Sequence, residues 1–291
     1  MFTNTSVTQT NMKYTYPNNF DRNRADDLHK LVDEAYNQLN QGTVWQPPTG
    51  YSIAATLSAK EFWKLPPGLS DIISHMLKPV PFGFVATKGA EVFVIIRGTK
   101  TPLEWMDDFT ALPVSFKPSG KDWGKTTQGL NTLYANLGPQ INSAISQLQA
   151  GGIRLTAIYI SGHSLGAAIA HLAAAGIAAQ FNVKPISYTF SGPRAGDEGF
   201  AAAFAAAGLV TWRMFNTEDI VPTVPPAAVQ LSTPNMGMHG LTPMTQALST
   251  FVQLGAVGYE HVGYPISATF HRATVADNHS MDDLIAEVNA Q

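Results

Sequence analysis

One segment constrains the fold of this chain more than any other. The apolar stretch IYIS runs directly into Gly162-His163-Ser164-Leu165-Gly166, and the small-residue stretch AAIAHLAAAGIAAQF follows. The first stretch predicts a buried strand, and the second predicts a helix packed closely on it. A serine between two such elements fits a nucleophile elbow, in which a strained turn lifts the hydroxyl above the sheet. Glycines on both sides are needed there, because strand and helix cross almost in contact.

The alternative interpretation of this segment is a glycine-rich turn with an incidental serine. Gly-x-Ser-x-Gly alone occurs by chance in many chains, so its place between a strand and a helix is what favours a catalytic role. The helix N-terminus beneath Ser164 also favours negative charge that develops on a substrate. We therefore predict Ser164 to be a nucleophile.

Strand and helix patterns alternate through much of the chain, which predicts an α/β fold with a mostly parallel sheet and helices on both faces. Gly138-Pro139 predicts a kink or break in the long helix, and the whole chain, 1–291, is predicted to form one domain after a loose extension at 1–20. The expected helices are 24–40, 128–152, 164–181, 197–208 and 281–290, and the expected strands are 82–87, 91–98, 153–162, 185–193, 209–216 and 263–270.

Composition excludes several classes of function. Charged residues make up only 13% of the chain, the net charge is −3, and there is no run of lysine or arginine that would bind nucleic acid. Cysteine is absent, which excludes disulfides, thiol nucleophiles and cysteine-ligated metals. No apolar run approaches the ~20 residues that a transmembrane helix needs. The first residues are polar and lack the apolar core of a signal peptide, so we expect a cytoplasmic protein or one secreted by another route or after signal removal.

A serine nucleophile needs a base and an orienting acid, which follow it in the order acid, histidine in this architecture. Asp219 follows the strand at 209–216 closely and is the favoured acid; Glu218 is its neighbour, and Asp197 opens a helix, where aspartate usually caps backbone N–H groups. His279 is the favoured base, since Ser280 and Asp283 form a capping pattern beside it. The other histidines after the acid are His239, His261 and His271; the last ends a strand and is the main alternative.

Several separated motifs resemble the class 3 lipases, the family of the filamentous-fungal triacylglycerol lipases. They are EVFVIIRGT, EWMDDF, ISGHSLGAAIA, TFSGPRAGD, RMFNTEDIVPTVPP and YEHVG, in family order between about residues 80 and 282. The sequence departs from the family where Thr126-Thr127-Gln128-Gly129-Leu130 replaces a Val-His-x-Gly-Phe pattern. It also lacks the disulfides of the fungal members, which indicates a bacterial-type enzyme.

The resemblance implies an α/β-hydrolase fold with a triad of Ser164, Asp219 and His279. It also implies an oxyanion hole formed by the backbone N–H groups of Thr99 and Leu165, with Asp108 orienting Thr99; an ordinary helix cap is the alternative role of Asp108. The segment 101–109 resembles the family's lid, and its expected substrate-facing or lid residues are Leu103, Trp105, Met106, Asp108 and Phe109. A packed loop is the alternative for this segment. The Pro/Met-rich stretch 222–258 is either a wall of the acyl pocket or core packing.

These features predict a carboxylic-ester hydrolase that works through an acyl-enzyme, without metal or cofactor. Triacylglycerol lipase is the leading substrate class, and phospholipase A1 and feruloyl-type esterase are alternatives. A non-catalytic binding protein with a hydrolase fold is the alternative from another class. The expected partners are a lipid or small ester and the lipid–water interface, with neither nucleic acid nor a transmembrane segment.

Overall fold

A seven-stranded sheet forms the centre of the molecule, with the strand order β1-β2-β3-β6-β7-β9-β11. The computed structural model describes residues 16–61, 77–100, 112–225, 227 and 258–291. Strands β1, β2 and β3 pair antiparallel, whereas β3, β6, β7, β9 and β11 pair parallel. The predicted mostly parallel sheet is therefore present. The strands are β1 (Ser52–Ala59), β2 (Val80–Lys88), β3 (Glu91–Ile96), β6 (Ala157–His163), β7 (Ile186–Phe190), β9 (Val210–Asn216) and β11 (Tyr264–Ala268).

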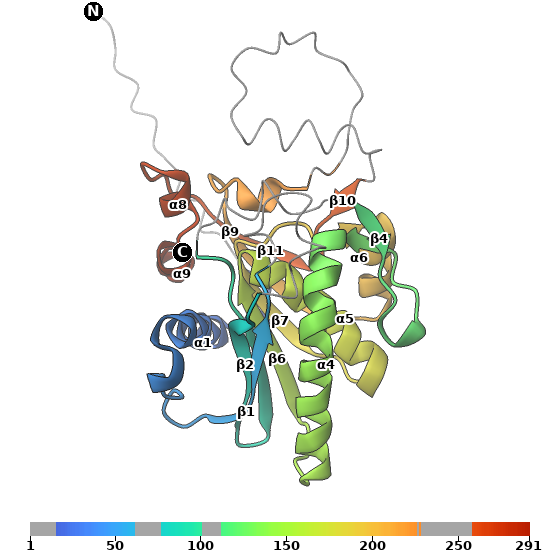
Figure 1. Cartoon of the computed structure of the whole chain (residues 1–291). Helices are drawn as coiled ribbons and strands as arrows, with labels where there is room; N and C mark the ends of the chain where they lie inside the picture. The colour runs from blue at the N-terminus through green and yellow to red at the C-terminus, as the bar shows by residue number, and fades with distance from the viewer. Residues whose placement is uncertain (1–15, 62–76, 101–111, 226, 228–257) are drawn as a thin grey trace, which may run out of the picture.

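Helices cover both faces of this sheet (Figure 1). One face carries α1 (Arg22–Gln41) and α9 (Met281–Ala290), and the other carries α4 (Gln128–Ala150), α5 (Leu165–Phe181) and α6 (Glu198–Ala206). None of the described helices is long and apolar enough to cross a membrane. The shorter elements are η1 (Gly42–Val44), η4 (Pro118–Gly120), η5 (Val221–Thr223) and α8 (Val275–Asn278).

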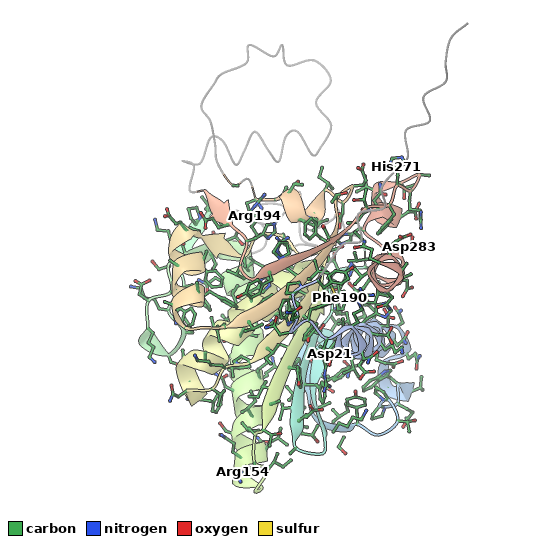
Figure 2. The ribbon with its side chains drawn as sticks, turned by 180° about the vertical axis from the view of Figure 1, so that it is seen from behind. Asp21, Arg154, Phe190, Arg194, His271 and Asp283 are labelled. Carbon is green, nitrogen blue, oxygen red and sulfur yellow. The ribbon has the colours of Figure 1, made fainter. Side chains whose placement is uncertain are left out.

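The alternation of side chains along each strand divides the core into two layers. On β7, Tyr188 and Phe190 pack with the α1 and α9 residues, whereas Ser187 and Thr189 belong to the opposite face. Figure 2 shows Phe190 in the middle of the molecule. On α1, Leu28 is fully buried in the same layer, and burial of such a side chain stabilises the fold by about 2 kcal/mol. The sheet is packed on both faces by these two layers, and this packing fixes the positions of the carboxyl ends of its parallel strands relative to one another.

Several helices have a polar side chain that caps their N-terminus. The Asp197 side chain accepts from the backbone N–H of Phe200 at 2.9 Å, which confirms the cap expected of this residue. The Ser280 hydroxyl accepts from the N–H of Asp283 at 3.2 Å, so the predicted capping pattern at the start of α9 is also confirmed. Thr127, in the stretch where the sequence departs from the family, caps α4. The cap of α9 matters for the site because it fixes the chain directly after His279.

Some local predictions were wrong. Helix α4 runs without a break through Gly138-Pro139, where we expected a kink or break. Residues 16–20 were assigned to a loose extension, but the Tyr16 hydroxyl donates to the backbone oxygen of Val288, and Phe20 packs edge-on against Trp212. The sequence patterns also missed β1 and a small second sheet. This sheet has the order β10-β8-β5-β4, formed by β10 (Tyr259–Glu260), β8 (Gly196–Asp197), β5 (Lys125–Thr127) and β4 (Pro113–Ser115).

Candidate active site

Ser164 stands at a strained turn between β6 and α5. Its backbone has φ 56° and ψ −128°, a conformation that side-chain-bearing residues rarely adopt. A Cβ added to Gly162 would lie 2.3 Å from the carbonyl oxygen of Gly166, and one added to Gly166 would lie 2.3 Å from that of Ile96. Only glycine fits at both positions, so these two residues permit the turn that the sequence predicted.

The end of β3 lies directly against this turn. A Cβ added to Gly98 would lie 2.8 Å from Ser164 Cβ, so the two backbones are in close contact. Arg97 holds this segment: its guanidinium donates to the carbonyl oxygens of Pro81 at 2.8 Å and Gly98 at 2.6 Å. The next residue, Thr99, is 5% exposed, and Leu165 begins α5 on the other side of the serine. Both residues proposed for the oxyanion hole thus flank Ser164.

Asp219 and His279 form a buried pair at the same edge of the sheet. His279 Nδ1 lies 2.7 Å from Asp219 Oδ2, and both residues are 2% exposed. The other carboxylate oxygen, Oδ1, accepts from the backbone N–H of Val221 at 3.0 Å. Because the carboxylate can only accept, His279 donates through Nδ1–H, which leaves a lone pair on Nε2 to accept a proton. An imidazole in this state has the form required of a general base.

The two groups that would exchange a proton both lack hydrogen-bond partners. Ser164 Oγ and His279 Nε2 are buried, and neither is hydrogen bonded among the residues that the structure describes. A buried polar atom without a partner in a folded protein calls for an explanation, and a reaction that uses both groups would supply one. In unliganded serine hydrolases the serine–histidine contact is often long and tightens when substrate binds.

Asn216 links the loops that carry the acid and the base. Its side-chain amide donates to the backbone oxygens of Phe270 at 2.9 Å and Asn278 at 3.0 Å. Its side-chain oxygen accepts from the backbone N–H of Glu218 at 3.2 Å and Phe270 at 3.1 Å. The residue is fully buried, so these bonds fix the chain beside Asp219 and the chain before His279 in one arrangement.

The alternative acids and bases lie elsewhere. His271 is 81% exposed in its side chain, as its position at the outer edge in Figure 2 also shows, and its Nδ1 lies 3.8 Å from the Glu218 carboxylate. Asp197 caps α6. His261 Nε2 donates to the backbone oxygen of Pro222 at 2.8 Å, as suits a structural residue. Among the described residues, Asp219 and His279 are paired, and the backbone oxygen of His279 lies 3.1 Å from Nε2 of His163, the residue before Ser164, whereas the alternatives have other partners.

Some sequence predictions lie outside the described residues. They concern the lid residues Leu103, Trp105, Met106, Asp108 and Phe109, together with His239 and most of the stretch 222–258. The role of Asp108 in orienting Thr99 therefore stays a prediction.

An open pocket of about 270 Å³ adjoins the site on the side of α1. Thr99, His163 and His279 line it, together with Tyr36 and Asp33 from α1. Sequence reasoning missed Tyr36 and His163. A tyrosine in an amphipathic helix carries no signal of its own, and His163 is a variable position of Gly-x-Ser-x-Gly. Within the described ranges, one group of side chains has the composition of a metal site: His29, Asp33 and Asp282. His29 Nε2 lies 2.8 Å from Asp282 Oδ1, and this contact joins α1 to α9.

Comparison with known proteins places this geometry in a family. The model of the family described as lipase (class 3) matches residues 93–229, a range that contains the elbow and the acid loop. Over this part of its length the chain is similar to the class 3 lipase family.

Two curated relatives and one solved structure illustrate this similarity. Phospholipase A(1) DAD1 of Arabidopsis thaliana is 29% identical over 212 residues, which cover 62% of this chain and 46% of the relative. A lipase of Rhizomucor miehei is 31% identical over 142 residues, covering 47% of this chain and 38% of the relative. The chain thus spans less than half the length of these relatives. A solved triacylglycerol lipase, described as having a serine-protease triad, has a TM-score of 0.60 at 21% identity, covering 84% of this chain and 79% of that one. This likeness confirms the predicted α/β-hydrolase fold.

Proposed function

We propose that this protein is a lipase that hydrolyses carboxylic esters of lipids through an acyl-enzyme formed on Ser164. One observation carries the proposal: the buried Asp219–His279 pair, at 2.7 Å, lies at the same sheet edge as a serine in a strained elbow. Burial of a serine hydroxyl and an imidazole nitrogen without partners is costly for folding alone, and a reaction that uses both gives a reason for it.

The mechanism follows from the arrangement. His279 Nε2 takes the proton of Ser164 Oγ as this oxygen attacks the ester carbonyl carbon. The negative charge on the carbonyl oxygen is stabilised by the backbone N–H groups of Thr99 and Leu165, and loss of one such donor typically costs ~3 kcal/mol of transition-state stabilisation. His279 then protonates the leaving alcohol, and water, deprotonated by the same imidazole, hydrolyses the acyl-enzyme. Asp219 keeps the imidazole in the required tautomer throughout.

Triacylglycerol is the leading substrate class, and phospholipid is the second candidate. The solved triacylglycerol lipase shares the fold over most of both chains, which supports the first. The plant phospholipase A(1) relative matches the larger part of this chain, 62% against 47% for the fungal lipase, which supports the second. The low content of charged residues, 13%, fits transient contact with a lipid–water interface in either case.

A substrate panel tests the proposal. Purified protein is assayed on p-nitrophenyl esters from butyrate to palmitate, on emulsified triacylglycerol, on phospholipid vesicles and on methyl ferulate. We expect hydrolysis of the p-nitrophenyl and triacylglycerol esters, and loss of all hydrolysis in Ser164→Ala. Faster hydrolysis of phospholipid would assign the second candidate, and preference for methyl ferulate would indicate a feruloyl-type esterase. If no ester is cleaved, the protein is a non-catalytic member of the fold.

Assays across the solubility limit of one ester test the contact with an interface. We expect the rate to rise sharply where the substrate forms droplets, since adsorption then concentrates the protein on its substrate. A smooth saturation curve through that limit would contradict the interfacial contact while leaving ester hydrolysis intact.

A further inference from the structure

Three hydrogen bonds connect the end of β3 to the chain of His279. The backbone N–H of Gly98 donates to the Tyr36 hydroxyl oxygen at 2.9 Å. The same hydroxyl lies 2.9 Å from His163 Nδ1, and His163 Nε2 lies 3.1 Å from the backbone oxygen of His279. Four residues far apart in sequence are thus joined in one path that passes beside Ser164.

The chemistry of the end groups fixes the direction of every bond in this path. A carbonyl oxygen can only accept, so His163 Nε2 carries a hydrogen and donates to His279. Burial, together with the nearby His279, lowers the pKa of His163 well below its ordinary value, so its ring is neutral and Nδ1 has a lone pair. Tyr36 must therefore donate its hydroxyl hydrogen to Nδ1, while its oxygen accepts from Gly98. Burial raises the pKa of Tyr36, which keeps that hydrogen in place.

Each end of the path lies next to a group that the proposed reaction uses. Gly98 precedes Thr99, and its Cα approaches so closely that an added Cβ would lie 2.7 Å from the Tyr36 oxygen and 2.8 Å from Ser164 Cβ. At the other end, the rings of His163 and His279 lie with centroids 4.6 Å apart. A shift of Tyr36 would therefore move the oxyanion-hole segment and the base relative to the nucleophile.

We propose that Tyr36 is a positioning residue. Through its hydrogen bonds to Gly98 and His163, it fixes the positions of the oxyanion-hole segment and of the base, His279, relative to Ser164. The inference rests on the proposed function, since it assigns Tyr36 a role in that reaction. Neither side chain is hydrogen bonded to Ser164 Oγ or His279 Nε2. Their role is to hold the N–H donors of the oxyanion hole close to the carbonyl oxygen that becomes charged, and the base close to the proton that it accepts. A misplacement of about 1 Å can cost on the order of a hundredfold in rate.

The first test removes one oxygen from each of two tyrosines. Tyr36→Phe removes the hydroxyl of the path, and Tyr134→Phe removes the hydroxyl of another tyrosine, on α4 and 9% exposed, as a matched control. We expect Tyr36→Phe to lower kcat about 10- to 100-fold with KM nearly unchanged, because a positioning defect appears in the transition state. A trifluoromethyl ketone that mimics the tetrahedral intermediate should bind more weakly by a similar factor. Tyr134→Phe should change kcat and the affinity for the trifluoromethyl ketone by less than about twofold.

A double-mutant cycle tests whether the path acts as a unit. His163→Phe removes both ring nitrogens and so breaks the second and third bonds; adding Tyr36→Phe should therefore lower kcat little further than His163→Phe alone. Independent, multiplying losses would contradict a shared path. An unchanged kcat in Tyr36→Phe, or a loss that appears only in KM, would overturn the proposal.

A measurement on the unmodified protein does not depend on whether the variants fold. Nitrogen-15 NMR of the histidine rings should show His163 neutral with its hydrogen on Nε2, at neutral pH. A hydrogen on Nδ1, or a charged ring, would contradict the path of donors. If this tautomer is found but the wild-type protein hydrolyses no ester, the proposed function is wrong. The hydrogen-bond path would then be confirmed, but the positioning role of Tyr36 would be wrong as well.

Discussion

Glu218 and His271 face each other on the surface, with the carboxylate oxygen 3.8 Å from Nδ1 and side-chain exposures of 49% and 81%. These were the nearest rivals of Asp219 and His279 in the sequence. Their pairing with each other, in solvent, separates them from the buried acid–base pair one and eight positions further along the chain. Of these two carboxylate–histidine pairs, only the Asp219–His279 pair is shielded from water.

Substitution of the two pairs should have opposite effects. Glu218→Ala combined with His271→Ala should keep kcat/KM within about twofold, since an exposed ion pair contributes little. His279→Ala should lower kcat about 10³-fold or more, because the neighbouring His163 has both ring nitrogens hydrogen bonded, to Tyr36 and to the backbone of His279. Steady-state kinetics on a soluble p-nitrophenyl ester measures both. A large loss in the surface double variant with a small loss in His279→Ala would reverse the assignment.

Asn216→Ala should destabilise the protein. The substitution removes a fully buried amide that joins the acid loop to the base loop through four hydrogen bonds, and it leaves buried backbone groups without partners. We expect a loss of about 3 kcal/mol in the free energy of unfolding, measured by urea denaturation. Asn136→Ala, on the exposed side of α4, is the control and should change stability by less than about 0.5 kcal/mol. Equal effects would show that Asn216 has no special structural role.

The protein should lose stability in acid through two buried histidines. Burial, chiefly, lowers the pKa of His171 and of His261 from 6.5 to about 3, with Arg213 contributing to both. The folded state keeps these rings neutral, whereas the unfolded chain binds a proton below pH 6.5. Unfolding therefore takes up protons, and stability falls as the pH drops from 6.5 toward 3.

His171→Leu tests the His171 part of this effect; both ring nitrogens of His171 are buried without partners among the described residues. At about pH 5 the variant should recover about 2 kcal/mol relative to wild type, beyond any difference at neutral pH. Urea denaturation at a series of pH values measures the slope. Parallel stability curves for the two proteins would contradict the role of His171 in acid denaturation.

Gly162→Ala should prevent the elbow from forming. Its added Cβ would meet backbone atoms of Gly166 at 2.3 Å and 2.5 Å, which cannot move aside without separating α5 from the sheet. We expect a loss of stability above about 3 kcal/mol, or failure to fold, monitored by circular dichroism and thermal unfolding. At Gly152 an added Cβ would meet no atom within 4 Å and only the positive φ of 86° is strained, so Gly152→Ala should cost about 1 kcal/mol. A well-folded Gly162→Ala protein would contradict the close crossing.

Features set by local sequence were predictable. The alternation of buried strands and small-residue helices predicted the parallel part of the sheet, and the glycines around Ser164 predicted the elbow. The cap at Ser280 marked the loop of His279, because capping is a short-range pattern. Asp197 was recognisable as a cap for the same reason.

Features set by long-range packing were not predictable. Strand β1 joins the sheet through its pairing with β2, and the short strands β4, β5, β8 and β10 exist only because distant segments meet. Pro139 suggested a break in α4, but the helix continues through it, since tertiary packing of the flanking turns outweighs one missing hydrogen bond. The contacts of Tyr36 with Gly98 and His163 depend in the same way on how α1 lies on the sheet.

Covalent trapping tests the central claim most directly. The protein is treated with a fluorophosphonate, digested, and analysed by mass spectrometry to find the modified residue. We predict a single adduct on Ser164, strongly slowed in His279→Ala and absent in Ser164→Ala. A protein that hydrolyses esters while carrying the adduct on another residue, or while remaining unmodified at Ser164, would contradict the assignment of this serine as the nucleophile.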